Sequence, residues 1–210
     1  MSDSTRLGWL GVFRLALVQA SLGAVVVLTT STLNRVMVVE LALPAALPGF
    51  LVALHYFVQL SRPRFGHESD RGGRRTPWIV GGMALLGLGG FLAASSTAVM
   101  ASTTLGGVAL ATFAFLLIGA GVGACGTSLL VLLATSVAPE RRAPAATLTW
   151  VMMIASFAIT ATVAGHFLDP FSFQRLMGVT GAVSVMALTV TVLATWGLEA
   201  ATERPPQSLS

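Results

Sequence analysis

Residues 106–136 read GGVALATFAFLLIGAGVGACGTSLLVLLATS and contain no charged side chain. A helix needs roughly 20 mostly apolar residues to cross the hydrocarbon core of a bilayer. Continuous apolarity favours a helix over a barrel strand, because barrel strands alternate polar and apolar side chains. The stretch therefore predicts a membrane-spanning helix. It is too long for one perpendicular span, which predicts a tilt or a part that lies outside the membrane.

Five further apolar stretches surround this one. The six predicted spans cover residues 15–33, 45–61, 77–100, 106–136, 145–167 and 176–196. The predicted fold is an all-α membrane protein whose six-helix domain covers residues 15–197. It is preceded by a short segment, residues 1–14, in which charged residues argue against a cleavable signal peptide. It is followed by a polar tail, residues 198–210, which is typical of a disordered end or the start of a linker.

Composition and charge agree with a membrane protein. Of the 210 residues, 55% are hydrophobic and 10% are charged, and the net charge is +4. The arginines lie in turns without interleaved aromatic residues, which argues against nucleic-acid binding. With the amino terminus inside, ten arginines are cytoplasmic and two, Arg35 and Arg175, are outside: Arg6, Arg14, Arg62, Arg64, Arg71, Arg74, Arg75, Arg141, Arg142 and Arg204. This bias predicts that both termini are cytoplasmic.

One arginine-rich turn, residues 62–77, reads RPRFGHESDRGGRRTP. Arginines in such a turn can serve topology alone. The spacing, however, resembles the signature loop of the major facilitator superfamily, and the matching positions are Gly66, Asp70, Arg71, Gly73, Arg74 and Arg75. In that superfamily the glycines permit a tight turn and the charges act against neighbouring helix ends. The resemblance implies a cytoplasmic conformational latch rather than catalysis.

A second turn has the sequence Pro139-Glu140-Arg141-Arg142. It resembles the short acidic-basic turn that the same superfamily has at the corresponding place. The two turns leave three spans on each side of a midpoint near Ser102. The resemblance therefore implies a 3+3 inverted repeat, like one half of a major facilitator superfamily transporter.

Longer stretches resemble one family within that superfamily, the PucC family of photosynthetic bacteria. They are residues 22–56 (LGAVVVLTTSTLNRVMVVELALPAALPGFLVALHY), 121–134 (GVGACGTSLLVLLA), 139–157 (PERRAPAATLTWVMMIASF) and 164–172 (AGHFLDPFS). Members of this family assist the assembly of light-harvesting complexes and have about twice as many spans. The resemblance covers nearly all of this chain but only the amino-terminal half of the family.

The PucC resemblance implies a light-harvesting assembly factor in the inner, intracytoplasmic photosynthetic membrane of a bacterium. It would bind or deliver bacteriochlorophyll as cargo, or bind nascent antenna polypeptides. The expected partners are membrane lipid, light-harvesting polypeptides or a photosynthetic core complex, and either a missing carboxy-terminal half or a second copy. Half of a small-solute transporter and an inactive truncated fragment remain alternatives.

Acidic residues bear on these alternatives. None lies in the middle of a predicted span, which argues against a proton-coupled transporter. The chain has only three aspartates, far apart, whereas membrane prenyltransferases that complete chlorophyll synthesis hold magnesium in aspartate-rich loops. No G-x-S-x-G motif of a serine hydrolase occurs. We therefore expect a protein that is not an enzyme.

Two histidines are candidate ligands of a pigment, because neutral imidazole is the usual axial donor to chlorophyll magnesium. His55 lies within a predicted span, and His166 lies at the outer end of another, beside Gly165 and one turn after Thr162. Alternatively, each imidazole hydrogen-bonds a neighbouring helix or carbonyl group, or His166 belongs to a capped helix end.

A glycine pair offers a further surface. Gly119 and Gly123 have the G-x-x-x-G spacing that lets a second helix, or a flat pigment, approach the backbone closely. Helix packing is the simpler interpretation of this pair.

Overall fold

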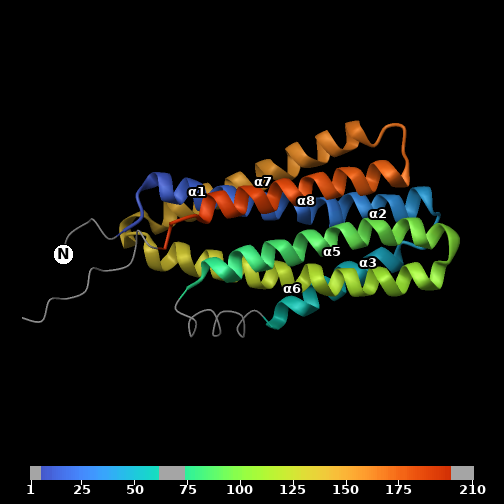
Figure 1. The fold of residues 1–210 in the computed structure, drawn as a ribbon, viewed down its shortest axis with the longest axis horizontal. Coiled ribbons are helices and arrows are strands. Elements are labelled where there is room, and N and C mark those ends of the chain that lie inside the picture. The colour runs from blue at the N-terminus through green and yellow to red at the C-terminus, as the bar shows by residue number, and fades with distance from the viewer. Residues whose placement is uncertain (1–5, 62–73, 200–210) are drawn as a thin grey trace, which may run out of the picture.

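The computed structural model describes residues 6–61 and 74–199, and this part of the chain is a bundle of helices without strands (Figure 1). The α-helices are α1 (Trp9–Val27), α2 (Leu33–Arg35), α3 (Ala46–Val58), α5 (Thr76–Ser102), α6 (Thr104–Ser136), α7 (Arg142–Phe167) and α8 (Phe173–Thr195). The predicted all-α architecture is confirmed.

Five helices are long and apolar enough to cross a membrane: Trp9–Glu40, Thr76–Ser102, Thr104–Ser136, Pro139–Phe167 and Phe173–Thr195. The sixth, α3, has 13 residues, which give a length of about 20 Å. It continues into a short 3-10 turn, Gln59–Ser61. The chain is therefore a multi-pass membrane protein in which the second apolar helix is shorter than the rest.

The first helix is longer than the predicted range 15–33. It begins at Trp9 and runs to Glu40, through α1, α2 and two π-helical turns, Leu28–Thr32 and Val36–Glu40. The helix starts at Trp9 rather than near Leu15, so Arg14 lies inside it. In the structure, the guanidinium of Arg14 donates hydrogen bonds to the carbonyls of Leu193 and Trp196, so the charge is accommodated within a helix.

The longest apolar stretch forms one unbroken helix. α6 has 33 residues and is about 50 Å long, which exceeds the roughly 30 Å hydrocarbon core. Only Thr103 separates it from α5, so these two helices form a tight antiparallel hairpin. The midpoint expected near Ser102 coincides with this turn.

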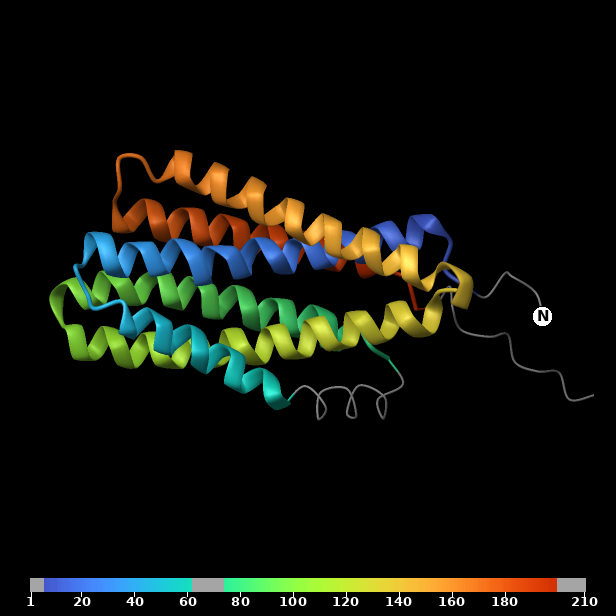
Figure 2. The same ribbon diagram turned by 180° about the vertical axis from the view of Figure 1, so that it is seen from behind.

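The most extensive helix contacts follow a regular scheme. α5 packs against both α6 and α8, α1 packs against both α7 and α8, and α3 packs on α6. Figure 2 shows α7 and α3 on opposite outer sides of the bundle. The start of α1 and the end of α8 lie at the same end of the bundle (Figure 1). We call this the terminal end.

Burial is uneven among the helices. Within their most apolar windows, 56% of residues are buried in the first helix, in α5 and in α6, against 17% in α7 and 22% in α8. The core consequently lies between the first helix and the α5–α6 hairpin. α7 presents most of its surface outward, because α1 is its only extensive neighbour.

Candidate functional site

Glycines bring α5 and α6 into backbone contact. A Cβ atom added at Gly82 would lie 2.5 Å from the backbone nitrogen of Cys125, and one added at Gly121 would lie 2.5 Å from that of Leu86. Real Cβ contacts are not this short, so only glycine fits at either place. The hairpin therefore has little freedom to change its spacing at these positions.

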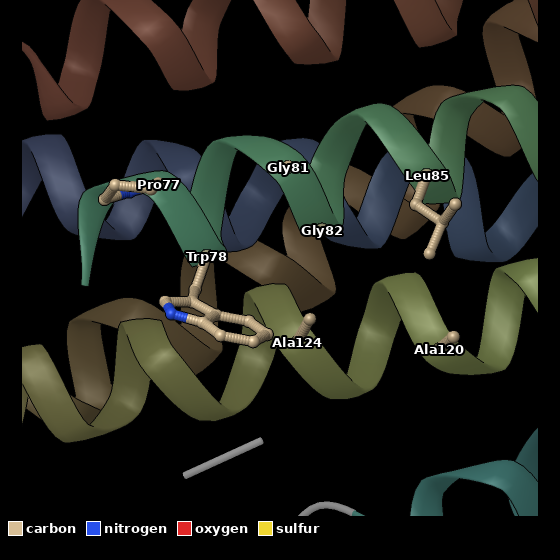
Figure 3. Close-up of a pocket in the computed structure, with 7 residues that line it drawn as sticks. All are labelled: Pro77, Trp78, Gly81, Gly82, Leu85, Ala120 and Ala124. Carbon is tan, nitrogen blue, oxygen red and sulfur yellow. The ribbon is translucent and has the colours of Figure 1, made fainter. Parts of the chain in front are cut away.

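A groove opens between α5 and α6 near the terminal end. It has a volume of about 300 Å³ and is lined by Pro77, Trp78, Gly81, Gly82, Leu85, Ala120 and Ala124. Figure 3 shows the indole of Trp78 extending from α5 over α6 near Ala124, with Leu85 farther along α5. The lining is almost wholly apolar, so the groove suits hydrocarbon or a flat apolar surface.

Two charged side chains secure helix ends beside this groove. The carboxylate of Glu199 accepts hydrogen bonds from the backbone N–H groups of Arg75 and Thr76, the latter at 3.0 Å, and so caps the start of α5. Arg14 caps the end of α8, as described above. A negative charge at a helix start and a positive charge at a helix end are the favourable arrangement. Sequence inspection missed both caps, because each joins residues far apart in the chain.

The predicted latch is only partly described. Gly66, Asp70, Arg71 and Gly73 lie outside the described residues. Arg74 is exposed at the entrance to α5, and Arg75 is partly buried next to Glu199. The described part of this turn therefore joins the end of α8 to the start of α5.

The second predicted turn lies at the terminal end. Pro139–Arg141 forms one 3-10 turn and α7 begins at Arg142. The Nε of Arg142 donates to the carbonyl of Val137 at 3.2 Å, while Glu140 is exposed. The bond from Arg142 closes the turn between α6 and α7.

The two candidate histidines have different surroundings. His55 is 1% exposed, its Nε2 lies 2.8 Å from the side-chain nitrogen of Gln59, and its ring meets Tyr56 edge to face. Its imidazole is thus enclosed between neighbouring side chains and has little room for a large pigment.

His166, by contrast, is exposed at the end of α7. Its ring meets Phe167 edge to face, and neither ring nitrogen bonds to any described residue. It lines a shallow hollow with Phe167, Asp169, Arg175, Gly178 and Val179. A Cβ atom added at neighbouring Gly165 would meet nothing within 4 Å, so the helix surface next to His166 is open at that position. The geometry offers one accessible nitrogen donor beside a small-residue surface.

The glycine pair on α6 faces inward. A Cβ atom at Gly119 would lie 2.7 Å from the backbone carbonyl of His55 and 2.7 Å from Cβ of Val58. The absence of a side chain at Gly119 therefore allows α3 to pack closely against α6. Gly123 is buried. At Gly119, therefore, the neighbour is a helix of this chain. Within residues 6–61 and 74–199, no three His, Cys, Asp or Glu side chains gather to hold a metal ion.

These features define an α-helical, multi-pass membrane protein whose described residues include an accessible histidine, His166, and an apolar groove at the terminal end. Residues 32–209 match the model of the family described as PUCC protein. The chain belongs to this family, as the resemblance noted above implies.

Relatives with known names cover most of this chain. It is 55% identical over 199 residues to the bacteriochlorophyll synthase 44.5 kDa chain of Rhodobacter capsulatus, covering 95% of this chain and 46% of that protein. It is 34% identical over 204 residues to protein PucC of Rhodovulum sulfidophilum, covering 90% and 44%. The chain thus spans about half the length of the curated relatives it matches. No solved structure matches it.

Proposed function

We propose that this protein is an assembly factor for photosynthetic light-harvesting complexes and that it binds bacteriochlorophyll or nascent antenna polypeptides without transforming them. The observation that carries the proposal is the match of residues 32–209 to the PucC family. A relative named as a chain of bacteriochlorophyll synthase supports the link to that pigment.

His166 is the proposed pigment ligand. Axial ligation of a chlorophyll needs a single nitrogen donor and an open surface beside it, and His166 supplies both. Phe167 and Val179 offer apolar surface to the macrocycle, while Arg175 can meet a polar ring substituent. The bound pigment would be cargo, and the role of this chain would be to hold it and limit its contact with water.

α7 is the proposed docking surface for an antenna polypeptide. Its exposed apolar side chains include Trp150, Ile154, Ile159 and Val163, which are spread around the helix because α1 covers only part of it. A single-span polypeptide could pack against this exposed surface while His166 holds pigment at the end of the same helix. The pigment and the polypeptide would then lie close to each other on one side of the bundle.

The test is purification of the full chain from a pigmented host in mild detergent. We expect bacteriochlorophyll, light-harvesting subunits or both to copurify. His166→Leu should lower the pigment per protein severalfold, whereas the control His67→Leu, in the predicted signature loop, should leave it unchanged. A preparation that carries neither pigment nor antenna subunits would rule out the proposal.

The terminal end is proposed to face the cytoplasm of a bacterial inner membrane. The helix ends there carry five arginines, as the positive-inside rule expects of a cytoplasmic side: Arg14 at the end of α8, Arg74 and Arg75 before α5, and Arg141 and Arg142 at the turn before α7. A fluorescent protein fused to the carboxy terminus should therefore fluoresce, and alkaline phosphatase fused there should be inactive. The opposite pattern would reverse the orientation.

The helix contacts support a proposed 3+3 repeat. The helices in most extensive contact are the pairs α5–α6, α5–α8, α1–α7, α1–α8 and α3–α6. If α1 is exchanged with α6, α3 with α7 and α5 with α8, the same five pairs result. An inverted repeat of three helices produces this property. An experimental structure in which no single rotation superposes the two sets of three helices would contradict the repeat.

Because relatives are about twice as long, the complete activity is proposed to need further helices, from a second half or a second copy of this chain. Half of a small-solute transporter remains the alternative. Substrate-dependent flux in reconstituted vesicles that is lost in Asp70→Asn would favour that alternative.

A further inference from the structure

The start of α5 separates two open grooves that meet at Pro77. One is the α5–α6 groove of Figure 3, which passes Trp78 and Leu85. The other has a volume of about 310 Å³ and lies between α5 and α8, where Val80 faces Val192. Between them, α5 presents the exposed residues Pro77 and Gly81, which project little. The two grooves therefore form one forked surface around the first turns of α5.

A positive charge stands at the head of this surface. Arg74 is exposed and lines the α5–α8 groove, and its side chain makes no hydrogen bond or ion pair to any described residue. Glu199 lines the same groove, but its carboxylate accepts the backbone N–H groups of Arg75 and Thr76, and Arg14 caps α8. Among the described residues, Arg74 thus has no anionic partner and can meet an anion that arrives from outside the bundle.

Two tryptophans mark the level at which this charge lies in the membrane. Trp78 borders the first groove, and Trp196, which is 74% exposed, borders the second. Tryptophan is enriched where hydrocarbon meets lipid head groups. Arg74 precedes α5, so it lies at head-group level, while Leu85 and Val192 lie deeper along the two grooves.

We infer that this surface binds an anionic diacyl phospholipid from the leaflet at the terminal end. The phosphate contacts Arg74, and the two acyl chains lie in the grooves on either side of Pro77 and Gly81. Basic pockets between transmembrane helices bind anionic lipid head groups by the same combination of charge and apolar contact. The site is independent of the proposed role in light-harvesting assembly.

Other occupants fit less well. Free inorganic phosphate would use Arg74 but leave the apolar side chains of both grooves, such as Leu85 and Val192, uncovered. A transmembrane helix packed along α5 would meet the exposed side chains of Leu88, 52% exposed, and Phe91, 41% exposed, directly beyond the grooves. A forked apolar surface with one cation at its head matches a lipid with two chains and a phosphate.

Native mass spectrometry of the purified full chain tests the inference. The protein is equilibrated with equal amounts of phosphatidylglycerol and phosphatidylcholine, and the bound lipids are counted. The unmodified chain should retain more phosphatidylglycerol than phosphatidylcholine. Arg74→Gln should lower that preference about fivefold, the effect of one arginine–lipid contact. The matched control is Arg35→Gln, which removes an exposed arginine at the opposite end of the bundle.

A second variant tests the grooves separately from the charge. Val192→Trp fills the α5–α8 groove and should lower retention of both lipids while leaving their ratio unchanged. Millimolar inorganic phosphate should displace little phosphatidylglycerol. Equal preference in the Arg74→Gln and Arg35→Gln proteins would overturn the inference, as would complete displacement by phosphate. Circular dichroism verifies that each variant is folded, and loss of pigment binding in any of them bears on the proposed function alone.

Discussion

Two helices whose most apolar windows have equal mean hydropathy, α5 and α7, have very different positions in this molecule. In their most apolar windows 56% of residues are buried in α5 but only 17% in α7. α5 meets α6 through glycines at backbone distance, while α7 meets α1 through side chains. Apolarity is sufficient to place both helices in a membrane. Glycines that admit the backbone of a neighbouring helix distinguish the deeply buried α5 from the more exposed α7.

The same difference appears in what each glycine contacts. A Cβ atom at Gly82 would meet the backbone of Cys125, which cannot rotate away. A Cβ atom at Gly23 on α1 would meet side-chain atoms of Met153, Ser156 and Phe157 on α7, at 2.8–2.9 Å. Side chains can change rotamer, so the α1–α7 contact is the more adaptable one. An adaptable contact suits a helix that is proposed to receive antenna polypeptides.

The largest expected effect comes from Gly82→Ala. Because the new methyl group forces the backbones of α5 and α6 apart, we expect a loss of about 2 kcal/mol in the free energy of unfolding. The measurement is an unfolding titration with sodium dodecyl sulfate. Gly81→Ala is the matched control, since its methyl group would meet nothing within 4 Å and alanine favours the helix. Equal losses in both variants would remove the distinction between the two contact surfaces.

Gly23→Ala should lower the free energy of unfolding by less than Gly82→Ala, about 1 kcal/mol, because the methyl group displaces side chains rather than backbone. The same titration applies, with Gly178→Ala as control, since that position is open. A loss as large as that of Gly82→Ala would show that the α1–α7 contact is as rigid as the α5–α6 contact.

Glu199→Ala should destabilise the start of α5 by about 1 kcal/mol, because it removes the acceptor of two backbone N–H groups. Hydrogen exchange at residues 75–79 should accelerate. Glu140→Ala, which removes an exposed carboxylate near α7, should change the stability by less than about 0.5 kcal/mol. Unchanged exchange at α5 would mean that the helix start is held by other contacts.

Gln19→Leu should have the smallest effect. Gln19 is 5% exposed on α1; its Nε2 lies 3.1 Å from the sulfur of Met153, while its Oε1 is buried without a partner among the described residues. Leucine removes one weak bond and one unsatisfied acceptor, so the melting temperature should stay the same or rise slightly. A marked fall would show that the polar contact, not apolar packing, holds α7 to α1.

Much of the fold follows from local sequence. The range 77–100 predicted α5, which runs Thr76–Ser102, and the range 176–196 predicted α8, which runs Phe173–Thr195. Proline at the second position of α5 and continuous apolarity are local signals, and a proline opening a helix is favourable wherever it occurs. Pro139 likewise marks the turn before α7, whereas the midpoint near Ser102 was expected from the resemblance to the superfamily's two loops.

The remaining features depend on partners distant in the sequence. The first helix starts before Arg14 because that guanidinium meets the end of α8, and no local pattern contains this information. The different surroundings of His55 and His166 arise in the same way, since burial is set by which helices pack beside each histidine. The shallow burial of α7 could not be predicted from the hydropathy of its most apolar window, because the corresponding window of α5 has the same value.

The cap that Glu199 provides has a mechanical consequence. The two hydrogen bonds join the segment after α8 to the first residues of α5, which are also the residues that leave the arginine-rich turn. If α8 shifts along its axis, these bonds must either break or carry α5 with them. A force applied to the segment after α8 would therefore be transmitted to the arginine-rich turn by the Glu199 carboxylate, and the packing in the interior of the bundle would not be needed to transmit it.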